Sequence, residues 1–358
     1  MTNAPALLEE QAAASPSGPL LVVDELRTTI HTPRGDLRAV DGVSLTLDRG
    51  EMLGIVGESG SGKSVLGRTI MGLHTTGPTT TIQGRVAFDG LDIQQLEPAR
   101  LRELWGDRIG MVFQDPMTAL NPVKKIGVHL TETLRKHRGL SRAEARDRAL
   151  ELLAQVGIPD PRRRIGQFPH EMSGGMRQRV VIAMALANEP DLLIADEPTT
   201  ALDVTVQRQI LDLLDRLQDE LGMAVILISH NLGVVAGRAD RVAVMYAGRV
   251  VETAEAASLF RAPHHPYAEA LLDAIPRLEL PPHLRLDAID GAPPNMLRPP
   301  PGCRFAPRCR YAQDDCVATM PTLAATPGVP DHRFACFHPV HLDAPEPAAP
   351  TADTAGGR

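Results

Sequence analysis

The chain of 358 residues has a formal net charge of −7, with 43% hydrophobic and 23% charged residues. This length allows one large α/β domain and a smaller appendage, because single cores split into domains beyond roughly 250 to 300 residues. The acidic balance argues against a protein that binds nucleic acid through a broad basic surface, and no apolar run approaches the roughly 18 residues of a membrane-spanning helix.

Both ends of the chain are expected to be disordered. The predicted leader, residues 1–18, carries Glu9 and Glu10 where a secretory signal would carry Lys or Arg. The predicted tail, residues 345–358, is rich in Ala, Pro and Thr and has no hydrophobic periodicity. The sequence therefore predicts a cytoplasmic protein.

Apolar segments and a capping signal predict an α/β domain. The capping box that pairs Ser141 with Glu144 predicts a helix that ends near Gly157. Because strands and helices alternate, the sheet is expected to be parallel. The predicted strands are Leu20–Val23, Ser44–Leu47, Met52–Val56, Arg85–Phe88, Ala224–Ile228 and Arg241–Met245.

A domain boundary is predicted near residue 275. The sequence becomes rich in proline from about Leu278, and all four cysteines follow this point. The main domain is therefore expected at residues 19–275, followed by a C-terminal extension at residues 276–344.

The segment after Met52–Val56 matches the phosphate-loop pattern G-x-x-x-x-G-K-[ST] between a buried strand and a helix-compatible run. Glycines let backbone N–H groups approach phosphate, and the following helix adds its positive N-terminal dipole. Lys63 is expected to reach the β- and γ-phosphates, and Ser64 to bind Mg²⁺. The predicted nucleotide-binding segment consists of Gly57, Glu58, Ser59, Gly60, Ser61, Gly62, Lys63, Ser64 and Val65.

A second apolar strand, which begins after Asp191, delivers two carboxylates at its end. Asp196 suits Mg²⁺, which takes few carboxylates and keeps several waters. Glu197 could polarise the attacking water. An Asp-Glu pair after a strand can also cap a helix, but the phosphate loop upstream favours the catalytic interpretation.

Three further polar residues indicate a function only when their order relative to the other motifs is considered. Alone, Gln114, His230 and Asp203 each fit an ordinary polar loop position. The segment Met172–Gln178, with the sequence MSGGMRQ, resembles the signature motif of ABC-type ATPases and lies between Gln114 and the two carboxylates, as in that family. The resemblance implies an α/β P-loop NTPase with a RecA-like core, an antiparallel β subdomain, a helical signature subdomain and the small cysteine-containing extension.

The resemblance also implies roles at the matching positions. ATP would be sandwiched in a dimer between the phosphate loop of one subunit and Ser173, Gly174 and Gly175 of the other. These residues are expected to open a helix at Met176–Ala187 whose N-terminus faces the γ-phosphate. The implied roles of the remaining residues are catalytic base for Glu197, γ-phosphate contact for His230, Mg²⁺ sensing and coupling to the membrane partner for Gln114, and communication across the dimer for Asp203.

The chain departs from the general family pattern at two places. The segment Thr28–Arg34 contains no aromatic residue to stack on adenine, which leaves Ile30 and His31 as candidates, and Met176 replaces the usual Gln after the two glycines. With Met176, the motifs closely resemble those of dipeptide/oligopeptide/nickel importer ATP-binding subunits over about residues 20–340.

This closer resemblance implies a peripheral ATP phosphohydrolase at the cytoplasmic face of the cell membrane, coupled to transport. The implied partners are a homologous ATP-binding subunit in a heterodimer, two transmembrane permease subunits and an extracytoplasmic peptide-binding protein. Nickel or glutathione-like cargo stays open as an alternative to peptides. An ABC ATPase that acts outside transport is disfavoured by the single nucleotide domain, the lack of heptads and the acidic charge.

The extension contains Cys303, Cys309, Cys316 and Cys336, a set that also recurs in the importer subunits. Clustered thiols in a cytoplasmic chain more often bind metal than form disulfides. A 4Fe-4S cluster tolerates irregular spacing, whereas zinc sites usually have cysteines two to four residues apart; a 4Fe-4S cluster, zinc and unliganded core cysteines all stay open. The neighbouring His264-His265 pair is expected to lie in a solvated loop.

Overall fold

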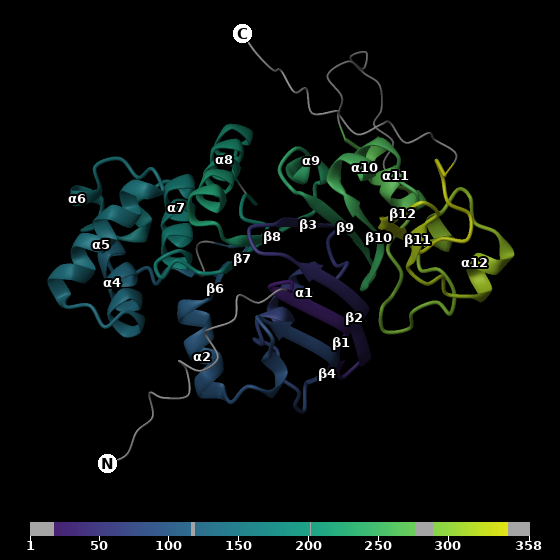
Figure 1. Cartoon of the computed structure of the whole chain (residues 1–358), viewed down its shortest axis with the longest axis horizontal. Coiled ribbons are helices and arrows are strands. Elements are labelled where there is room, and N and C mark those ends of the chain that lie inside the picture. The colour runs from purple at the N-terminus through teal and green to yellow at the C-terminus, as the bar shows by residue number, and fades with distance from the viewer. Residues whose placement is uncertain (1–17, 116–118, 201, 276–288, 343–358) are drawn as a thin grey trace, which may run out of the picture.

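The computed structural model describes residues 18–115, 119–200, 202–275 and 289–342. The predicted tail, nearly all of the predicted leader and the segment at residues 276–288 lie outside the described residues. Figure 1 shows a central sheet with a group of helices at one end, the cysteine-containing extension at the other, and a smaller antiparallel sheet beside it.

The central sheet has eight described strands in the order β11-β12-β10-β9-β3-β8-β7-β6. The run from β9 to β6 is parallel, and β10, β12 and β11 continue it in antiparallel fashion. Its strands are β3 (Met52–Val56), β6 (Ile109–Val112), β7 (Leu192–Asp196), β8 (Ala224–Ser229), β9 (Arg241–Tyr246), β10 (Arg249–Glu255), β11 (Ala324–Thr326) and β12 (Val329–Phe334). The C-terminal extension therefore adds strands directly to the sheet that carries the predicted phosphate loop and Asp196.

The smaller sheet, in the order β2-β1-β4-β5, packs beside α1. Its strands are β1 (Leu21–Thr32), β2 (Gly35–Leu47), β4 (Thr80–Phe88) and β5 (Leu91–Asp92). The first three are longer than predicted, because apolar runs mark only the part of each strand that faces the core, whereas pairing continues through polar residues such as Thr29 and Arg38.

The helices lie around both sheets. They are α1 (Lys63–Ile70), α2 (Pro98–Asp107), α4 (Ile126–His137), α5 (Arg142–Gln155), α6 (Pro161–Arg164), α7 (Gly174–Ala185), α8 (Val204–Leu221), α9 (Leu232–Val235), α10 (Ala256–Arg261), α11 (Pro266–Asp273) and α12 (Asp314–Ala318), with 3-10 turns at Ile93–Gln95, Pro169–Glu171 and Ala306–Arg308. In the described part of the chain, no helix is both long and apolar enough to cross a membrane.

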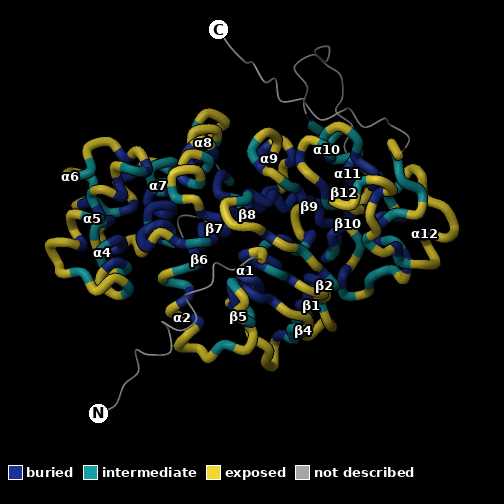
Figure 2. Tube along the Cα trace, viewed as in Figure 1, coloured by how far each residue is buried: buried dark blue, intermediate teal, exposed yellow. Residues whose placement is uncertain are grey.

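The local sequence explains where the elements begin and how they pack. Ser141 and Glu144 form the predicted capping box of α5, and α7 begins at Gly174, two residues earlier than predicted, because the Ser173 side chain caps it by accepting from the Met176 N–H. Strands β3, β7 and β8 are buried along their whole length, as parallel strands covered on both faces are (Figure 2). The predicted α/β architecture is confirmed.

Candidate nucleotide site

The loop between β3 and α1 needs glycine at two positions. A Cβ atom on Gly57 would lie 2.0 Å from the Met245 carbonyl oxygen, and one on Gly62 would lie 2.1 Å from the Ala39 carbonyl oxygen. Gly62 also has a φ of 100°, which L side chains rarely adopt. The loop is thereby held against β9 and β2, with Ser59 and Gly60 exposed at its tip.

Lys63 lies inside this loop. Its Nζ donates to the carbonyl oxygens of Gly57 at 2.7 Å and Glu58 at 2.9 Å. Burial lowers the pKa of the ammonium group, an effect that the nearby carboxylates of Glu197 and Asp196 oppose. No side chain caps the N-terminus of α1, so its first-turn N–H groups remain available to an anion beside Lys63.

Asp196 ends β7 next to the loop. Its Oδ1 accepts a hydrogen bond of 2.8 Å from the Ser64 hydroxyl, while its buried Oδ2 has no hydrogen-bond partner among the described residues. Burial raises the pKa of this carboxyl group. A buried carboxylate oxygen without a partner beside a hydroxyl is the type of oxygen donor set that Mg²⁺ takes, so the residues present fit a magnesium ion.

Three polar side chains from different parts of the chain lie around one carboxylate oxygen of Glu197. Its Oε2 lies 3.1 Å from Gln114 Nε2, 2.9 Å from Thr200 Oγ1 and 3.1 Å from His230 Nδ1. Glu197 itself has a φ of 47°, a left-handed conformation that is strained for a residue other than glycine and occurs often at functional sites.

The topology explains this convergence. In the parallel strands β3, β6, β7 and β8, the residues that follow the carboxyl ends meet at one edge of the sheet, where ligands of open α/β sheets bind. The structure therefore brings Lys63, Ser64, Gln114, Glu197 and His230 together. Thr200 was missed by the sequence analysis, and its only signal is its position three residues after Glu197.

The remaining predicted residues lie elsewhere. Ser173, Gly174 and Gly175 start α7, which lies among the helices at one end of the molecule, whereas α1 lies near its centre (Figure 1). The Asp203 side chain caps α8 by accepting from the Val206 N–H at 2.9 Å. Within the described residues, no hydrogen bond joins either segment to Lys63.

Comparisons with known proteins agree with this geometry. A family model described as ABC transporter matches residues 40–200, and one described as the C-terminal region of oligopeptide/dipeptide transporters matches residues 251–316. The oligopeptide transport ATP-binding protein OppD of Salmonella typhimurium is 50% identical over 92% of this chain and 96% of its own length. The corresponding OppD of Bacillus subtilis is 49% identical over 93% of this chain and 92% of its own length.

The chain belongs to the ABC transporter family of oligopeptide-type ATP-binding proteins. The solved dimer of the ATP-binding cassette MJ0796 in a post-hydrolysis state, bound to ADP and Pi, supports the same fold: it is 32% identical, covers 66% of this chain and 98% of its own, and gives a TM-score of 0.60. The chain is thus an ABC-type ATPase whose hydrolysis of ATP is coupled to transport.

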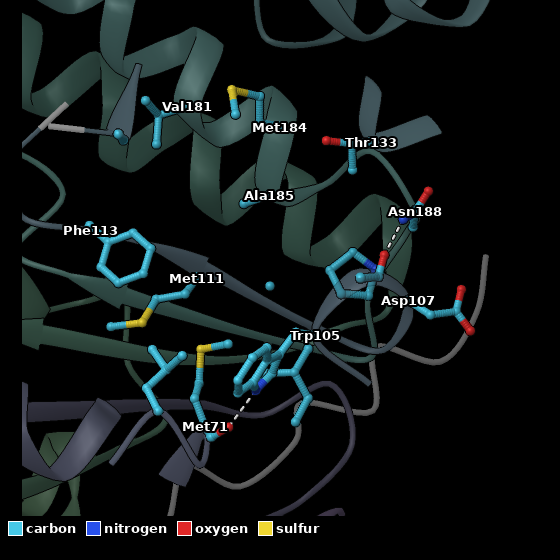
Figure 3. Close-up of a pocket in the computed structure, with 16 residues that line it drawn as sticks. Met71, Trp105, Asp107, Met111, Phe113, Thr133, Val181, Met184, Ala185 and Asn188 are labelled. Carbon is cyan, nitrogen blue, oxygen red and sulfur yellow. Dashed lines mark hydrogen bonds between the residues drawn. The ribbon is translucent and has the colours of Figure 1, made fainter. Parts of the chain in front are cut away.

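A cavity in this ABC ATPase lies beside the Gln114 segment, between the core and the helices at one end. It has a volume of about 320 Å³ and is mainly apolar. Figure 3 shows Trp105, Met111 and Phe113 on one side and Val181 and Met184 of α7 on the other. Phe113 precedes Gln114 directly, so the cavity lies at the same strand end as Gln114.

The expectation that His264 and His265 form a solvated loop is wrong. Both are buried, and their backbone N–H groups each donate a 2.7 Å hydrogen bond to the carboxylate of Glu252 on β10. His332 of β12 donates to the same carboxylate through Nε2 at 2.6 Å. This fully buried carboxylate therefore joins the core sheet of the ABC ATPase to its extension.

The structure brings the four cysteines of the extension close to one another. The Cys303 N–H donates to the Cys316 carbonyl oxygen at 2.7 Å. Burial, with a smaller contribution from the neighbouring thiolates of Cys303, Cys309 and Cys316, raises the pKa of the Cys336 thiol to about 12. Four neighbouring thiols suit a soft metal centre once deprotonated.

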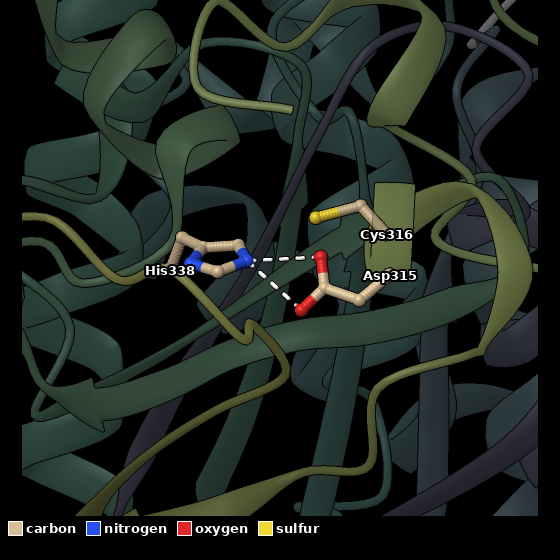
Figure 4. Close-up of side chains that lie close together, drawn as sticks. All are labelled: Asp315, Cys316 and His338. Atoms are coloured by element: carbon tan, nitrogen blue, oxygen red, sulfur yellow. Dashed lines mark hydrogen bonds and ion pairs between the residues drawn. The ribbon is translucent and has the colours of Figure 1, made fainter. Parts of the chain in front are cut away.

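An Asp-His pair lies at one corner of this group. Asp315, Cys316 and His338 are the only three His, Cys, Asp or Glu side chains within the described residues whose ligand atoms all lie within 4.8 Å of one another (Figure 4). The His338 ring contacts both Asp315 oxygens at 2.9 Å. A closed tetrahedral zinc site, with Zn–S bonds of about 2.3 Å, needs thiolates nearer than about 4 Å. Among the described residues, no three of the four cysteine sulfurs lie within 4.8 Å of one another.

Proposed function

We propose that this ABC ATPase binds Mg-ATP at the loop Gly57–Val65 and hydrolyses it by in-line attack of a water molecule that Glu197 orients. The observation that carries the proposal is the convergence of Gln114, Thr200 and His230 on one oxygen of Glu197, beside Lys63. Phosphoryl transfer requires little more of a protein than positioning and charge stabilisation, and this edge of the sheet supplies both.

Each residue at the edge has a specific task in this proposal. Lys63 exchanges its two carbonyl acceptors for phosphate oxygens, because the ammonium group is buried within the loop that would hold them. Ser64 and the unpartnered Oδ2 of Asp196 hold Mg²⁺, which neutralises phosphate charge when bound. His230 is half exposed next to Glu197 and contacts the γ-phosphate, and Gln114 senses the ion.

The site is completed by a second ATP-binding subunit. Ser173, Gly174 and Gly175 lie at the start of α7 and, among the described residues, make no hydrogen bond to their own Lys63, so in this proposal they serve the nucleotide of the partner. Together with Met176, this arrangement supports a heterodimer with a homologous ATPase. Asp203, at the start of α8, communicates across that dimer. Removal of the γ-phosphate by hydrolysis lets the dimer open.

The dimer works under two transmembrane permease subunits, which makes the chain a peripheral protein of the cytoplasmic membrane face.

We assign the apolar cavity beside Gln114 to an apolar segment of a permease. Movement of the Phe113-Gln114 strand end would change the contacts of a partner bound in this cavity. Met184→Glu places a charge in this cavity and should abolish recovery of permeases with the tagged chain. Arg208→Glu, on an exposed part of α8, is the matched control; equal recovery with both variants would contradict the assignment.

The cargo is an oligopeptide delivered by an extracytoplasmic peptide-binding protein, as the relatives' names and the match at residues 251–316 suggest. Uptake of a labelled oligopeptide by cells that lack the chain should return with the wild-type gene. Restoration of nickel or glutathione uptake without peptide uptake would instead support the alternative cargo.

The four cysteines hold a 4Fe-4S cluster in this proposal, because the thiols are close together but more widely spaced than zinc requires. Protein purified without oxygen should contain iron and acid-labile sulfide, both lost in Cys309→Ser and retained in Asp315→Asn. Stoichiometric zinc without sulfide would favour the alternative metal, and a metal-free protein would leave the cysteines as core residues.

A further inference from the structure

Glu58 places a carboxylate in the proposed phosphate loop, and its charge has the same sign as that of a polyphosphate ligand. Glu58 follows Gly57 directly, and its charge is close enough to Lys63 to raise the pKa of that ammonium group against the effect of burial. An unneutralised carboxylate here would repel ATP, since charges in a partly buried site are poorly screened.

The C-terminal extension neutralises this carboxylate. Arg308 donates to both oxygens of Glu58, from Nη1 at 2.6 Å and from Nη2 at 2.9 Å. The Arg308 side chain is only 4% exposed, against 27% for Glu58. A two-point pair between guanidinium and carboxylate fixes direction as well as charge, so the Glu58 carboxylate is held toward Arg308.

Arg308 is itself held in place. Its Nε donates to the Asp290 carbonyl oxygen at 2.9 Å and its Nη2 to the Ile289 carbonyl oxygen at 3.0 Å. Nη1 also lies 3.2 Å from the Tyr246 hydroxyl at the end of β9. The guanidinium group is thus held in one position by hydrogen bonds to both the extension and the core sheet.

A second contact, from α11, fixes the backbone of Glu58. The hydroxyl of the buried Tyr267, in α11, accepts a 2.8 Å hydrogen bond from the Glu58 N–H. The Glu58 carbonyl oxygen accepts from Lys63 and from the Ser61 N–H at 3.1 Å. Every polar group of Glu58 is therefore bonded, and residues after position 260 provide the contacts to its N–H and its carboxylate.

We propose that Arg308 is a positioning residue for nucleotide binding: by pairing with Glu58 it holds the phosphate loop open to the anion, so that the C-terminal extension sets the affinity for ATP. This rests on the proposed role of the loop Gly57–Val65. Arg308 is the residue before Cys309, so the affinity for nucleotide depends directly on the fold of the cysteine segment.

The test is calorimetric titration of the full-length chain with Mg²⁺ and the non-hydrolysable ATP analogue AMP-PNP. Arg308→Gln should weaken binding at least about tenfold, because it leaves the Glu58 charge unpaired. Arg308→Lys, which keeps the charge without the two-point geometry, should weaken it less. The matched control is Arg310→Gln, on the other side of Cys309 with 60% of its side chain exposed, and it should bind like the wild type.

The double variant separates positioning from simple structural support. If Arg308 acts through the charge of Glu58, Glu58→Gln combined with Arg308→Gln should recover affinity to within about threefold of the wild type. A double variant as weak as Arg308→Gln would overturn the proposal and make the contact merely structural. Wild-type affinity in both Arg308 variants would overturn it as well.

A further variant distinguishes failure of this inference from failure of the proposed site. Lys63→Ala should abolish AMP-PNP binding if the loop is the nucleotide site. If Lys63→Ala binds normally, the proposed site is wrong; if it does not bind while Arg308→Gln binds normally, only the role of Arg308 is wrong. Should Arg308→Gln fail to give a cooperative thermal transition, the comparison of Arg308→Lys with Arg310→Gln decides.

Discussion

Two carboxylates in the central sheet are completely buried, and they are bonded in opposite ways. Asp196 on β7 pairs with one hydroxyl and leaves Oδ2 without a partner among the described residues. Glu252 on β10 accepts from two backbone N–H groups and contacts His332, so both of its oxygens are bonded. A fully bonded buried carboxylate stabilises a fold, whereas one with an open oxygen points to a ligand.

The difference divides the sheet into two regions. At the strand ends of the proposed nucleotide site, Asp196 Oδ2 has no partner among the described residues. Burial raises the pKa of this carboxyl group, and Glu197 has a strained backbone, so both residues lower stability locally. In the extension, the polar groups satisfy one another. Substitutions in the first region should therefore change chemistry more than stability, and substitutions in the second should do the reverse.

The largest effect is expected for Asp196→Asn. Loss of the magnesium ligand should lower ATP turnover in the assembled transporter by about 100-fold or more. The free energy of unfolding should stay unchanged or increase, because burial raises the pKa of this carboxyl group and its ionised form therefore opposes folding at neutral pH. A large loss of stability in thermal unfolding would break the comparison.

Glu252→Ala should give the opposite pattern. It leaves two buried N–H groups and His332 without their acceptor, which costs about 3 kcal/mol in the free energy of unfolding. Denaturant unfolding measures the loss, with Glu255→Ala, at an exposed position near the end of the same strand, as the control. A variant as stable as the wild type but inactive would reverse the roles assigned to the two carboxylates.

A smaller effect is expected from pH. Burial lowers the pKa of His265 to about 3, and its neutral Nδ1 accepts from the Tyr267 N–H at 3.0 Å. The pKa of His265 is lower in the folded state than in the unfolded state. Its contribution to the free energy of unfolding is therefore complete above about pH 6.5 and is lost as the pH falls below that value. Stability should drop by about 2 kcal/mol between about pH 7 and about pH 5. His265→Asn, which keeps an acceptor, should reduce this slope; an unchanged slope would contradict the assignment.

The smallest effect is expected at Asp203. In the isolated chain its side chain caps α8, so Asp203→Ala should cost about 1 kcal/mol of stability and Asp203→Ser almost nothing. If Asp203 also acts across the dimer, both variants should weaken ATP-dependent dimerisation in size-exclusion chromatography. Normal dimerisation of Asp203→Ser would limit its role to the helix cap.

The convergence of the candidate site residues was predictable from the sequence because its signals are local. The phosphate loop follows an apolar strand directly, β3 was predicted with its observed bounds, and parallel strands bring Gln114, Glu197 and His230 together once their order is known. The predicted antiparallel strands were too short, since only their core-facing residues are apolar.

The extension was less predictable because its contacts join distant residues. Glu58 and Arg308 are 250 positions apart, and no local pattern marks either as half of a pair. His264 and His265 resemble a solvated loop before proline until Glu252 and β12 are placed beside them. The gathering of the four cysteines likewise depends on β12 joining the sheet.

The central claim is that Glu197 orients the attacking water. The most direct test is the rate of ATP hydrolysis by Glu197→Gln in the chain assembled with its membrane partners, with ATP binding measured on the same sample. The account predicts binding close to that of the wild type and a turnover lower by about 100-fold or more. Turnover at the wild-type rate would contradict it.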